Sequence, residues 1–287
     1  MELKWKADQE GAVHIRKKGE VVYLTYPALE ELQGFCHGFS TRLGGVSRGI
    51  FSSMNLSFTR GDEEQAVLEN YRRMADALGF SLEKTVCSDQ THTANVRYVT
   101  LEDAGKGIVR KKDYTDVDGL VTDVPGLTLV TSYADCVPLF FVDPVRRAVG
   151  LSHSGWRGTV GKIGAVTVRK MQEVFGSDPR DILAAIGPSI CQDCYEVSED
   201  VAQEFKQAFA RHSKEKQLLY RKEDGKYQLN LWRANELVLL EAGILSEHIS
   251  FPGLCTCCNP DFLFSHRASH GKRGNLSAFL GIRESIE

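Results

Sequence analysis

The sequence predicts a mixed α/β fold, of the α+β kind with a mixed sheet, in a single domain that covers residues 1–287. Short apolar runs typical of strands recur along the chain, and amphipathic stretches typical of helices lie between them. No Pro-, Gly- or Ser-rich segment is long enough to link two separate domains. A chain of this length buries about three quarters of its unfolded surface on folding, so a large core is expected.

Strands are expected where apolar and β-branched residues cluster. These runs are Val21–Thr25, Phe35–Ser40, Asn95–Val99, Leu127–Ser132, Val137–Val142, Ala148–Ser152, Ile182–Ile186 and Ser277–Ile282. Helical periodicity predicts helices at Glu63–Leu78, Thr159–Phe175, Ser198–Ala210 and Leu231–Ala242. Asp62 and Ser198 stand at the N-cap positions of two of them. Asp224-Gly225 supplies a tight turn, which predicts a hairpin over Leu219–Leu231.

Charge and composition exclude some classes of function. Hydrophobic residues make up 42% of the chain and charged residues 25%, and the formal net charge is -3. Such a chain has no broad basic field to hold nucleic acid. The N-terminus lacks an apolar signal-peptide core, and no run approaches about 18 apolar residues. We therefore expect a cytoplasmic protein without a membrane or nucleic-acid partner, whose cysteines are thiols or metal ligands.

The segment 132–159 holds the most informative residues. Two apolar runs flank Asp143-Pro-Val-Arg146, and proline at the second position favours a tight turn, so the segment predicts a hairpin. If Asp143 pairs with Arg146 and no bulge intervenes, Cys136 lies directly opposite His153. Directly opposed residues have Cβ atoms about 5 Å apart. One thiolate and one imidazole at that separation are able to bind the same metal ion.

His92 is the third candidate metal ligand, because it precedes the expected strand at 95–99 and can enter the same pocket from a strand end. Two imidazoles and one thiolate make a three-ligand zinc site with an open fourth position, which is typical of catalytic zinc. The same residues also suit a Cys136–His153 nucleophile pair, in which the imidazole deprotonates the thiol. The plainest alternative is that the three residues do not meet. Each histidine is then a hydrogen-bonded structural residue, and Cys136 is a small core residue.

Asp135 stands next to Cys136 in the sequence. Its carboxylate is a candidate proton acceptor in catalysis or a support for a metal ligand. A capping carboxylate at the entrance of a strand is the plainer alternative.

Two glycine-rich loops carry arginine. Ser154-Gly-Trp-Arg-Gly-Thr159 places Arg157 and free backbone N–H groups at a helix N-terminus, which is an anion-binding arrangement. Thr41-Arg-Leu-Gly-Gly-Val-Ser47 contributes Arg42 and Ser47. Together these loops are candidates for binding phosphate or ribose. Neither loop matches a phosphate-loop or dinucleotide fingerprint, so an ordinary strand-to-helix turn stays an alternative.

A second group of cysteines stands apart from Cys136. Cys191-Gln-Asp-Cys194 has the spacing of a zinc knuckle, whereas Cys255-Thr-Cys257-Cys258 lacks one clean spacing. Buried thiols are therefore the favoured interpretation, and a second metal site is the alternative.

These segments together resemble a family described first as multicopper polyphenol oxidoreductase or laccase-domain proteins, also called YfiH/YlmD-like, and later as purine nucleoside phosphorylases. The chain is similar to the YlmD type. The landmarks run in order through most of the chain. They are Ser40-Thr-Arg-Leu-Gly-Gly-Val-Ser47, Met54-Asn-Leu56, Gln90-Thr-His92, Asp118-Gly119, Ala134-Asp-Cys136, His153-Ser-Gly-Trp-Arg-Gly158, Ile186-Gly-Pro188, Cys194-Tyr-Glu-Val197 and Phe264-Ser-His-Arg267.

The resemblance implies a YfiH-like fold, related in layout to the cysteine hydrolase domain of a bacterial toxin. It implies zinc bound by His92, Cys136 and His153, with purine nucleosides and phosphate as small-molecule partners. The implied reactions are phosphorolysis of adenosine, inosine, guanosine and methylthioadenosine, together with deamination of adenosine. The segment Gly271-Lys-Arg-Gly274 departs from the pattern of the family, so no role is carried onto Arg273.

Zinc-bound water suits attack on the purine C6, and phosphorolysis needs phosphate held beneath the anomeric carbon of ribose. Copper is the alternative metal, but three His and Cys ligands fall short of the number that a multicopper cluster requires. A Cys136–His153 cysteine hydrolase and a non-catalytic metal-binding regulator are the remaining alternatives.

Overall fold

The computed structural model describes residues 2–6, 12–211 and 218–284. In these ranges the strands form two six-stranded sheets and one three-stranded sheet. The first sheet has the order β1 (His14–Lys18), β2 (Val21–Thr25), β3 (Phe35–Ser40), β15 (Leu276–Ile282), β7 (Thr128–Tyr133) and β4 (Thr85–Cys87). The second has the order β14 (Ile249–Ser250), β10 (Leu183–Ile186), β8 (Val137–Asp143), β9 (Ala148–Ser154), β6 (Gly119–Thr122) and β5 (Val96–Tyr98).

Both large sheets are mixed, as the sequence predicts. Each contains antiparallel pairs, whereas β4–β7, β5–β6 and β10–β14 run parallel. The expected strands are present with small shifts of their ends. Five further strands were not predicted, namely β1, β4, β6, β14 and β11 (Glu196–Val197), which have two to five residues each.

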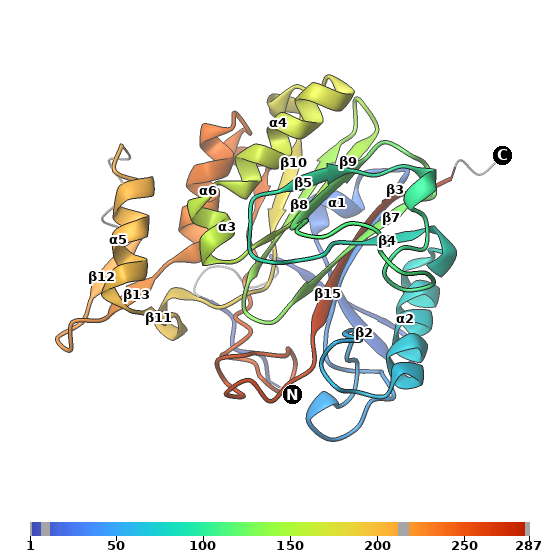
Figure 1. Cartoon of the computed structure of the whole chain (residues 1–287), viewed down its shortest axis with the longest axis horizontal. Helices are drawn as coiled ribbons and strands as arrows, with labels where there is room; N and C mark the ends of the chain where they lie inside the picture. Colours follow the sequence, from blue (N-terminus) through green and yellow to red (C-terminus); the bar gives the residue numbers. More distant parts are fainter. Residues whose placement is uncertain (1, 7–11, 212–217, 285–287) are drawn as a thin grey trace.

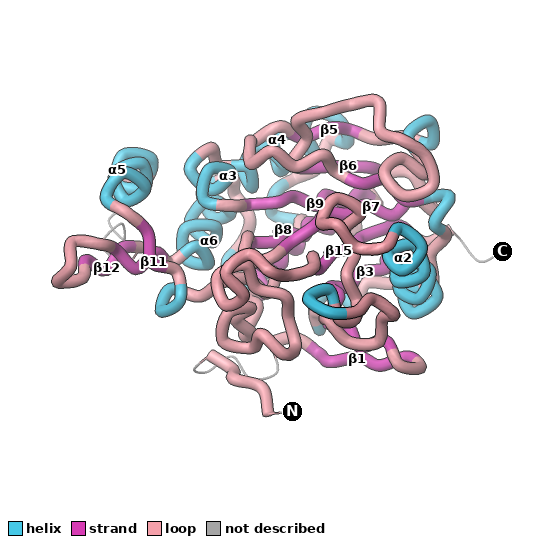
Figure 2. Tube along the Cα trace, turned by 60° about the horizontal axis from the view of Figure 1, so that its bottom comes forward, coloured by secondary structure: helices cyan, strands magenta, loops and turns pink. Residues whose placement is uncertain are grey.

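The two large sheets pack face to face, because the side chains of their strands alternate. Phe140 and Val142 of β8 join the core between the sheets, together with Leu280 of β15. Leu139 and Phe141 point to the opposite face, where helices cover the second sheet. The result is a helix–sheet–sheet–helix sandwich (Figures 1 and 2).

The helices cover the two outer faces. The described α-helices are α1 (Pro27–Glu30), α2 (Glu64–Leu78), α3 (Trp156–Val160), α4 (Ile163–Phe175), α5 (Glu199–Ala208) and α6 (Leu231–Glu241). α2 packs on the first sheet through Tyr71 and Met74, and α4 and α6 cover the second. The three-stranded sheet, in the order β11, β13 (Tyr227–Leu229), β12 (Leu219–Arg221), forms a side lobe with α5 at the left of Figure 1. It contains the hairpin expected at Asp224-Gly225.

Two helix predictions need correction. The helix expected over 159–175 is two helices, because Lys162 adopts a left-handed conformation with φ 55° and separates α3 from α4. Asp62 does not cap α2: Glu63 occupies the N-cap position, and the Asp62 carboxylate accepts hydrogen bonds from Ser47 and Asn55 instead. Ser198 does occupy the N-cap position of α5, although its side chain donates to Asp200.

The β8–β9 hairpin forms with a different register from the expected one. Asp143 pairs with Ala148, so residues 144–147 form the loop and Arg146 is not a pairing partner. The reason is local, because Oδ1 of Asp143 accepts the backbone N–H groups of Val145 and Arg146, both at 2.9 Å. These two bonds hold the chain in a wider turn.

The shift changes what lies opposite the candidate metal ligands. His153 pairs with Pro138, and Cys136 precedes the first residue of β8 instead of lying directly opposite His153. The prediction of direct opposition is therefore wrong. The register moved by two residues, and side chains along a strand alternate with a period of two. Cys136 therefore still lies on the same face of the sheet as His153.

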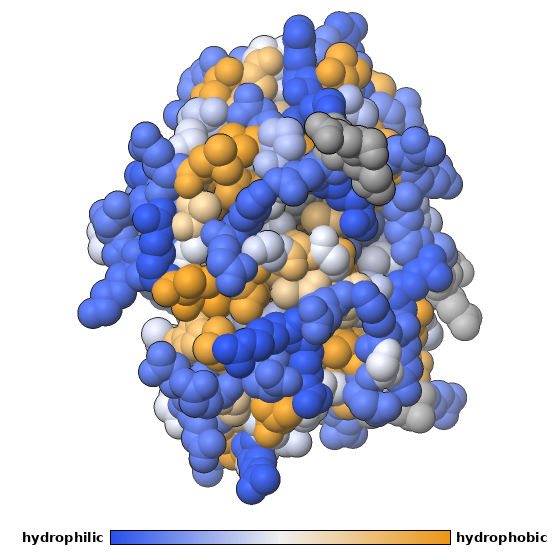
Figure 3. Space-filling view, turned by 90° about the vertical axis from the view of Figure 1, so that its right-hand side faces the viewer, coloured by the Kyte–Doolittle hydropathy of each residue, from blue (hydrophilic) through white to orange (hydrophobic). Residues whose placement is uncertain are grey.

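The surface and the helices give two further observations. Among the described residues, no helix combines the length and the apolar character that crossing a bilayer requires. On the face drawn in Figure 3, hydrophobic residues appear in separate small groups between hydrophilic ones.

Candidate metal centre

The three expected ligands come together at one end of the second sheet. His153 is in β9, Cys136 immediately precedes β8, and His92 lies in the loop before β5. Their ligand atoms all lie within 4.8 Å of one another. His153 is buried, Cys136 is half-buried and His92 is exposed, so the group opens to solvent on the His92 side. The two imidazole rings meet edge to face, with centroids 4.9 Å apart.

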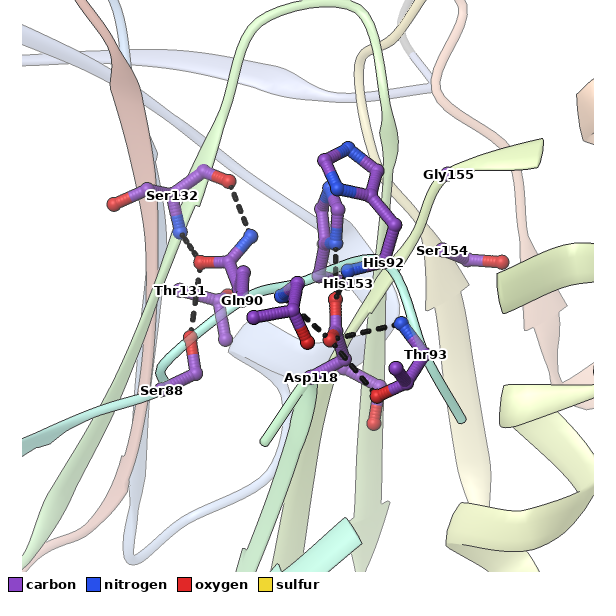
Figure 4. A network of polar contacts seen from close by, with 12 residues as sticks. Ser88, Gln90, His92, Thr93, Asp118, Thr131, Ser132, His153, Ser154 and Gly155 are labelled. Carbon is purple, nitrogen blue, oxygen red and sulfur yellow. Dashed lines mark hydrogen bonds and ion pairs between the residues drawn. The ribbon is translucent and has the colours of Figure 1, made fainter. Parts of the chain in front are cut away.

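Asp118 organises this group from beneath and is fully buried. Its carboxylate accepts the backbone N–H groups of Thr91 at 2.9 Å, His92 at 3.1 Å and Thr93 at 3.0 Å (Figure 4). These bonds hold His92 in a left-handed conformation with φ 68°, which is uncommon for a residue with a side chain. Sequence reasoning noted Asp118 as a landmark but assigned it no role.

Asp118 also orients His153. Nδ1 of His153 lies 2.7 Å from Oδ1 of the carboxylate, so Nδ1–H donates this bond and Nε2 is left for a metal ion. Burial would raise the pKa of the Asp118 carboxyl, but the bonds from His153 and the backbone of Thr93 lower it to about 2.

Cys136 and His153 form a charged pair in the metal-free protein. Burial would raise the pKa of the Cys136 thiol, but His153 and His92 outweigh burial and lower it to about 6. Burial would lower the pKa of His153, yet Cys136 and Asp118 raise it to about 9. Cys136 is thus a thiolate at neutral pH. A metal ion would bind the thiolate directly and displace a proton from His153, since a ligating imidazole is neutral.

Gly155 allows the three ligands to approach one another. A Cβ atom at this position would lie 3.0 Å from Cδ2 of His92 and 3.1 Å from Sγ of Cys136. Any side chain here would push two ligands apart. Two imidazoles and one thiolate, converging beside a glycine, are a donor set that fits a zinc ion with an open fourth position.

The three ligands line a pocket of about 450 Å³, within the usual range for small-molecule sites. Its apolar wall includes Phe58, which lies parallel to Tyr71 with ring centroids 5.6 Å apart. Its polar wall includes Lys112 and Arg273. The pocket therefore combines a flat aromatic surface with two cationic groups.

Arg273 is the cation that sequence reasoning left without a role. It lies just before β15, and burial lowers its pKa to about 10, so the guanidinium stays charged at neutral pH. Nη1 donates to the Gly274 carbonyl and to Asn275, whereas the buried Nε has no hydrogen-bond partner among the described residues. An unpaired buried N–H of a cation suits an anionic ligand.

Gln90 fastens the His92 loop to the first sheet. Its Nε2 donates to the carbonyl of Ser132 at 2.7 Å, and its Oε1 accepts the backbone N–H of Ser132 at 2.7 Å and the hydroxyl of Ser88 at 2.9 Å (Figure 4). The two sheets are thereby joined beside the pocket.

The structure does not bring the expected phosphate-binding residues Arg42 and Ser47 into the pocket lining. Arg42 donates to the carbonyls of Ser52 and Pro260, and Ser47 is buried and donates to Asp62 at 2.6 Å. Their polar groups bind neighbouring segments of the protein. Each residue therefore fastens the loop that carries it to other parts of the structure.

Arg157 and Asp135 also lie outside the pocket lining. Arg157 is exposed on α3 and stacks on Trp156 with 4.2 Å between the guanidinium carbon and the ring centroid. The carboxylate of Asp135 accepts the Thr256 hydroxyl at 2.6 Å and the Arg267 backbone N–H at 2.7 Å. Asp135 thus anchors the residue before Cys136 instead of facing the pocket.

The fold and the site define an α/β protein with a His–Cys–His candidate metal centre at the wall of a mixed aromatic and cationic pocket. The chain belongs to the multi-copper polyphenol oxidoreductase laccase family, whose sequence model matches residues 36–283. This confirms the resemblance seen in the sequence.

Relatives with assigned names support the same grouping. The chain is 40% identical over 256 residues to purine nucleoside phosphorylase YlmD of Geobacillus stearothermophilus, covering 88% of this chain and 91% of the relative. It is 39% identical over 251 residues to YlmD of Bacillus subtilis, with 86% and 88% covered. It is also 36% identical over 232 residues to adenosine deaminase RL5 of an unknown prokaryotic organism, with 80% and 87% covered.

The fold agrees with a solved structure in the same group. The crystal structure of the hypothetical protein YfiH from Bacillus licheniformis superposes with a TM-score of 0.87 at 36% identity, covering 94% of this chain and 99% of that chain. The YfiH-like fold expected from the sequence is confirmed.

Proposed function

We propose that this protein is a zinc-dependent purine nucleoside phosphorylase that acts on adenosine, inosine, guanosine and methylthioadenosine and also deaminates adenosine. One observation carries the proposal: the His92, Cys136 and His153 ligand set shares a pocket with the half-buried Arg273, whose Nε has no hydrogen-bond partner among the described residues. Relatives at 39% and 40% identity are named purine nucleoside phosphorylases, and another relative is named an adenosine deaminase.

Zinc fits the donor set better than the copper of the family description. Among the described residues, the groups that could share one ion are this one and a cluster of four cysteines, and neither supplies the further histidines of a multicopper cluster. Zinc bound here would supply a Lewis acid and lower the pKa of a bound water towards about 7.

Different residues of the pocket would bind the purine ring and the phosphate. Phe58, supported by Tyr71, offers a flat surface for a purine ring, since aromatic rings prefer stacked contacts. Arg273 would hold phosphate by charge-assisted hydrogen bonds. Asp118 keeps the ring of His153 in one orientation throughout the reaction.

The remaining expected residues take other roles in this proposal. Asp135 positions Cys136 through the bonds to Thr256 and Arg267 and does not transfer a proton. Arg157 stays a proposed phosphate contact although it lies outside the pocket lining, because its exposed guanidinium stacks on Trp156 and makes no hydrogen bond to another described residue. A cytoplasmic location and small-molecule partners remain part of the proposal.

A cysteine hydrolase is the second candidate function. The observation that favours it is the Cys136 thiolate beside His153, since a lowered thiol pKa is also the mark of a cysteine nucleophile. The family resemblance also implies a layout related to a toxin's cysteine hydrolase domain. That layout stays a prediction, and it would agree with this second candidate function.

Product analysis tests the proposal. With inosine, hypoxanthine should appear only when phosphate is present, together with ribose 1-phosphate. With adenosine in phosphate-free buffer, inosine should form, because water is then the nucleophile. If the metal-replete protein consumes no purine nucleoside, the nucleoside proposal is wrong and the hydrolase remains.

A further inference from the structure

Four cysteines outside the pocket form a second tight cluster. Cys191 and Cys194 belong to the turn before β11, and Cys255 and Cys258 belong to the turn that follows residue 254. Their sulfur atoms all lie within 4.8 Å of one another, and those of Cys194 and Cys258 are 3.5 Å apart. The sequence favoured buried thiols because Cys255-Thr-Cys257-Cys258 mixes two spacings. The structure shows that Cys258, and not Cys257, completes the second C-x-x-C pair of the cluster.

A backbone N–H group points at one sulfur atom of this cluster. The N–H of Cys191 donates to Sγ of Cys255 at 3.2 Å. The N–H of Cys194 donates to the carbonyl of Cys191 at 3.1 Å, which closes the first cysteine turn. The ammonium group of Lys6 donates to Asp193, which lies between Cys191 and Cys194, at 2.8 Å. Donors directed at sulfur stabilise thiolates, and thiolates are the form of cysteine that binds metal.

The spacing fits one metal ion instead of two disulfides. Four sulfur atoms at about 2.3 Å from one zinc ion, placed at the corners of a tetrahedron, are about 3.8 Å apart. The sulfur atoms of Cys194 and Cys258 are 3.5 Å apart, close to this value, whereas a disulfide requires about 2.05 Å. All four cysteines are free thiols in the structure.

We propose that Cys191, Cys194, Cys255 and Cys258 bind a second zinc ion, which has a structural role. Two C-x-x-C pairs are the usual ligand set of a structural zinc site, and four protein ligands leave no open position for a substrate. Thiolate ligands favour zinc over magnesium, calcium or manganese. This site is separate from the His–Cys–His centre and takes no part in the proposed reaction.

The proposed ion would stabilise the two turns that bind Asp135, the residue before Cys136. Thr256, between two of the ligands, donates to the Asp135 carboxylate at 2.6 Å, and the N–H of Ile190 donates to the Asp135 carbonyl at 3.0 Å. Asp135 has φ 83° and is followed directly by Cys136. Both cysteine turns therefore hold the residue that sets the position of Cys136, and the ion would join the two turns.

The decisive sample is the His92→Ala/His153→Ala double variant, in which only the cysteine cluster keeps its ligands. Wild-type protein, exchanged into metal-free buffer, is expected to contain two zinc ions per chain and the double variant one. X-ray absorption at the zinc edge of the double variant should then show about four sulfur neighbours at about 2.3 Å and no nitrogen. Because no cysteine is changed, this readout does not depend on the folding of a cysteine variant.

A matched pair of cysteine variants completes the test. Cys258→Ser should lose one zinc, whereas Cys257→Ser, in the same turn but outside the cluster, should keep both. A single zinc with only sulfur neighbours in the wild type would support the cysteine site. It would also show that the His–Cys–His centre does not hold zinc in the purified protein. A single zinc with mixed nitrogen and sulfur neighbours, bound iron, or four missing thiols in a titration of the unfolded, unreduced chain would overturn the proposal.

Discussion

Oδ1 of Asp118 lies 2.7 Å from Nδ1 of His153, while the same carboxylate binds the backbone of the His92 loop. One buried side chain thus sets the ring orientation of one candidate ligand and the backbone conformation of another. Geometry at the centre depends on Asp118 although it is not itself a ligand.

Asp118→Asn is therefore expected to weaken zinc binding at the His–Cys–His centre by about 10- to 100-fold, the usual effect of losing a carboxylate behind a histidine ligand. Competition with a chromophoric chelator measures this affinity. Asp123→Asn, just beyond the other end of β6, serves as the control, because among the described residues its carboxylate accepts a hydrogen bond only from the exposed Tyr98 hydroxyl. Equal affinities for the two variants would show that Asp118 has no part in metal binding.

The stability that Asp118 contributes should depend on pH in a defined direction. Its pKa is lowered from 3.8 to about 2 in the folded protein, so its contribution is present above about pH 4 and is lost as the pH falls through about 2. Thermal unfolding of metal-free protein should show a deficit for Asp118→Asn at pH 7 that shrinks towards pH 2. A deficit that is unchanged over this range contradicts the assignment.

Alkylation of Cys136 reports the charge of its thiol. In metal-free protein the rate should fall as the pH drops through about 6, since the thiolate is the reactive form and its pKa is lowered to that value from 9.0. Added zinc should slow the reaction by occupying the sulfur. Mass spectrometry locates the modified residue and separates it from Cys87, whose pKa burial raises to about 12. A midpoint near pH 9 would indicate an ordinary thiol, whereas a midpoint near pH 6 with a rate that zinc does not change would favour the cysteine nucleophile.

Arg273→Ala should raise the KM for phosphate by about tenfold or more, the effect expected when a charge-assisted hydrogen bond is lost. The KM for inosine should change much less. Lys272→Ala is the matched control, because Lys272 is an exposed cation one residue away and does not line the pocket. Equal effects of the two variants would mean that Arg273 acts only through the general charge of the surface.

Gly155→Ala tests the close approach of the ligands. The backbone at Gly155 has φ -70°, which alanine adopts without strain, so any effect comes from the added Cβ beside His92 and Cys136. Overpacking of this kind costs about 1–3 kcal/mol, and the loss should appear as weaker zinc binding. Zinc at the cysteine cluster should be retained. Unchanged affinity at the His–Cys–His centre would show that the ligands do not need this spacing.

The β8–β9 hairpin shows which features the sequence predicts correctly and which it does not. Alternating apolar residues predicted both strands and placed Cys136 and His153 on one face. The register was wrong because Asp143 binds two backbone N–H groups of the loop, and such side-chain bonds are not encoded in hydrophobic periodicity. Because the shift was by two residues, the shared face survived.

Other parts of the site depend on contacts between distant segments. Arg273 reaches the pocket because β15 lies between β3 and β7, a neighbourhood that no local pattern specifies. Arg42 and Ser47 looked like anion ligands from the local sequence, yet in the folded protein their polar groups bind other segments of the chain. Likewise, only the structure selects Cys258 over Cys257 as the partner of Cys191.

The central claim is that a metal ion at His92, Cys136 and His153 supports phosphorolysis of purine nucleosides. The most direct measurement removes metal with a chelator, restores zinc or copper, and follows inosine with and without phosphate by liquid chromatography. The account predicts that zinc, and not copper, restores phosphate-dependent formation of hypoxanthine and ribose 1-phosphate, and that the His92→Ala/His153→Ala variant is not restored. Full activity without metal, or hypoxanthine released equally in the absence of phosphate, would contradict it.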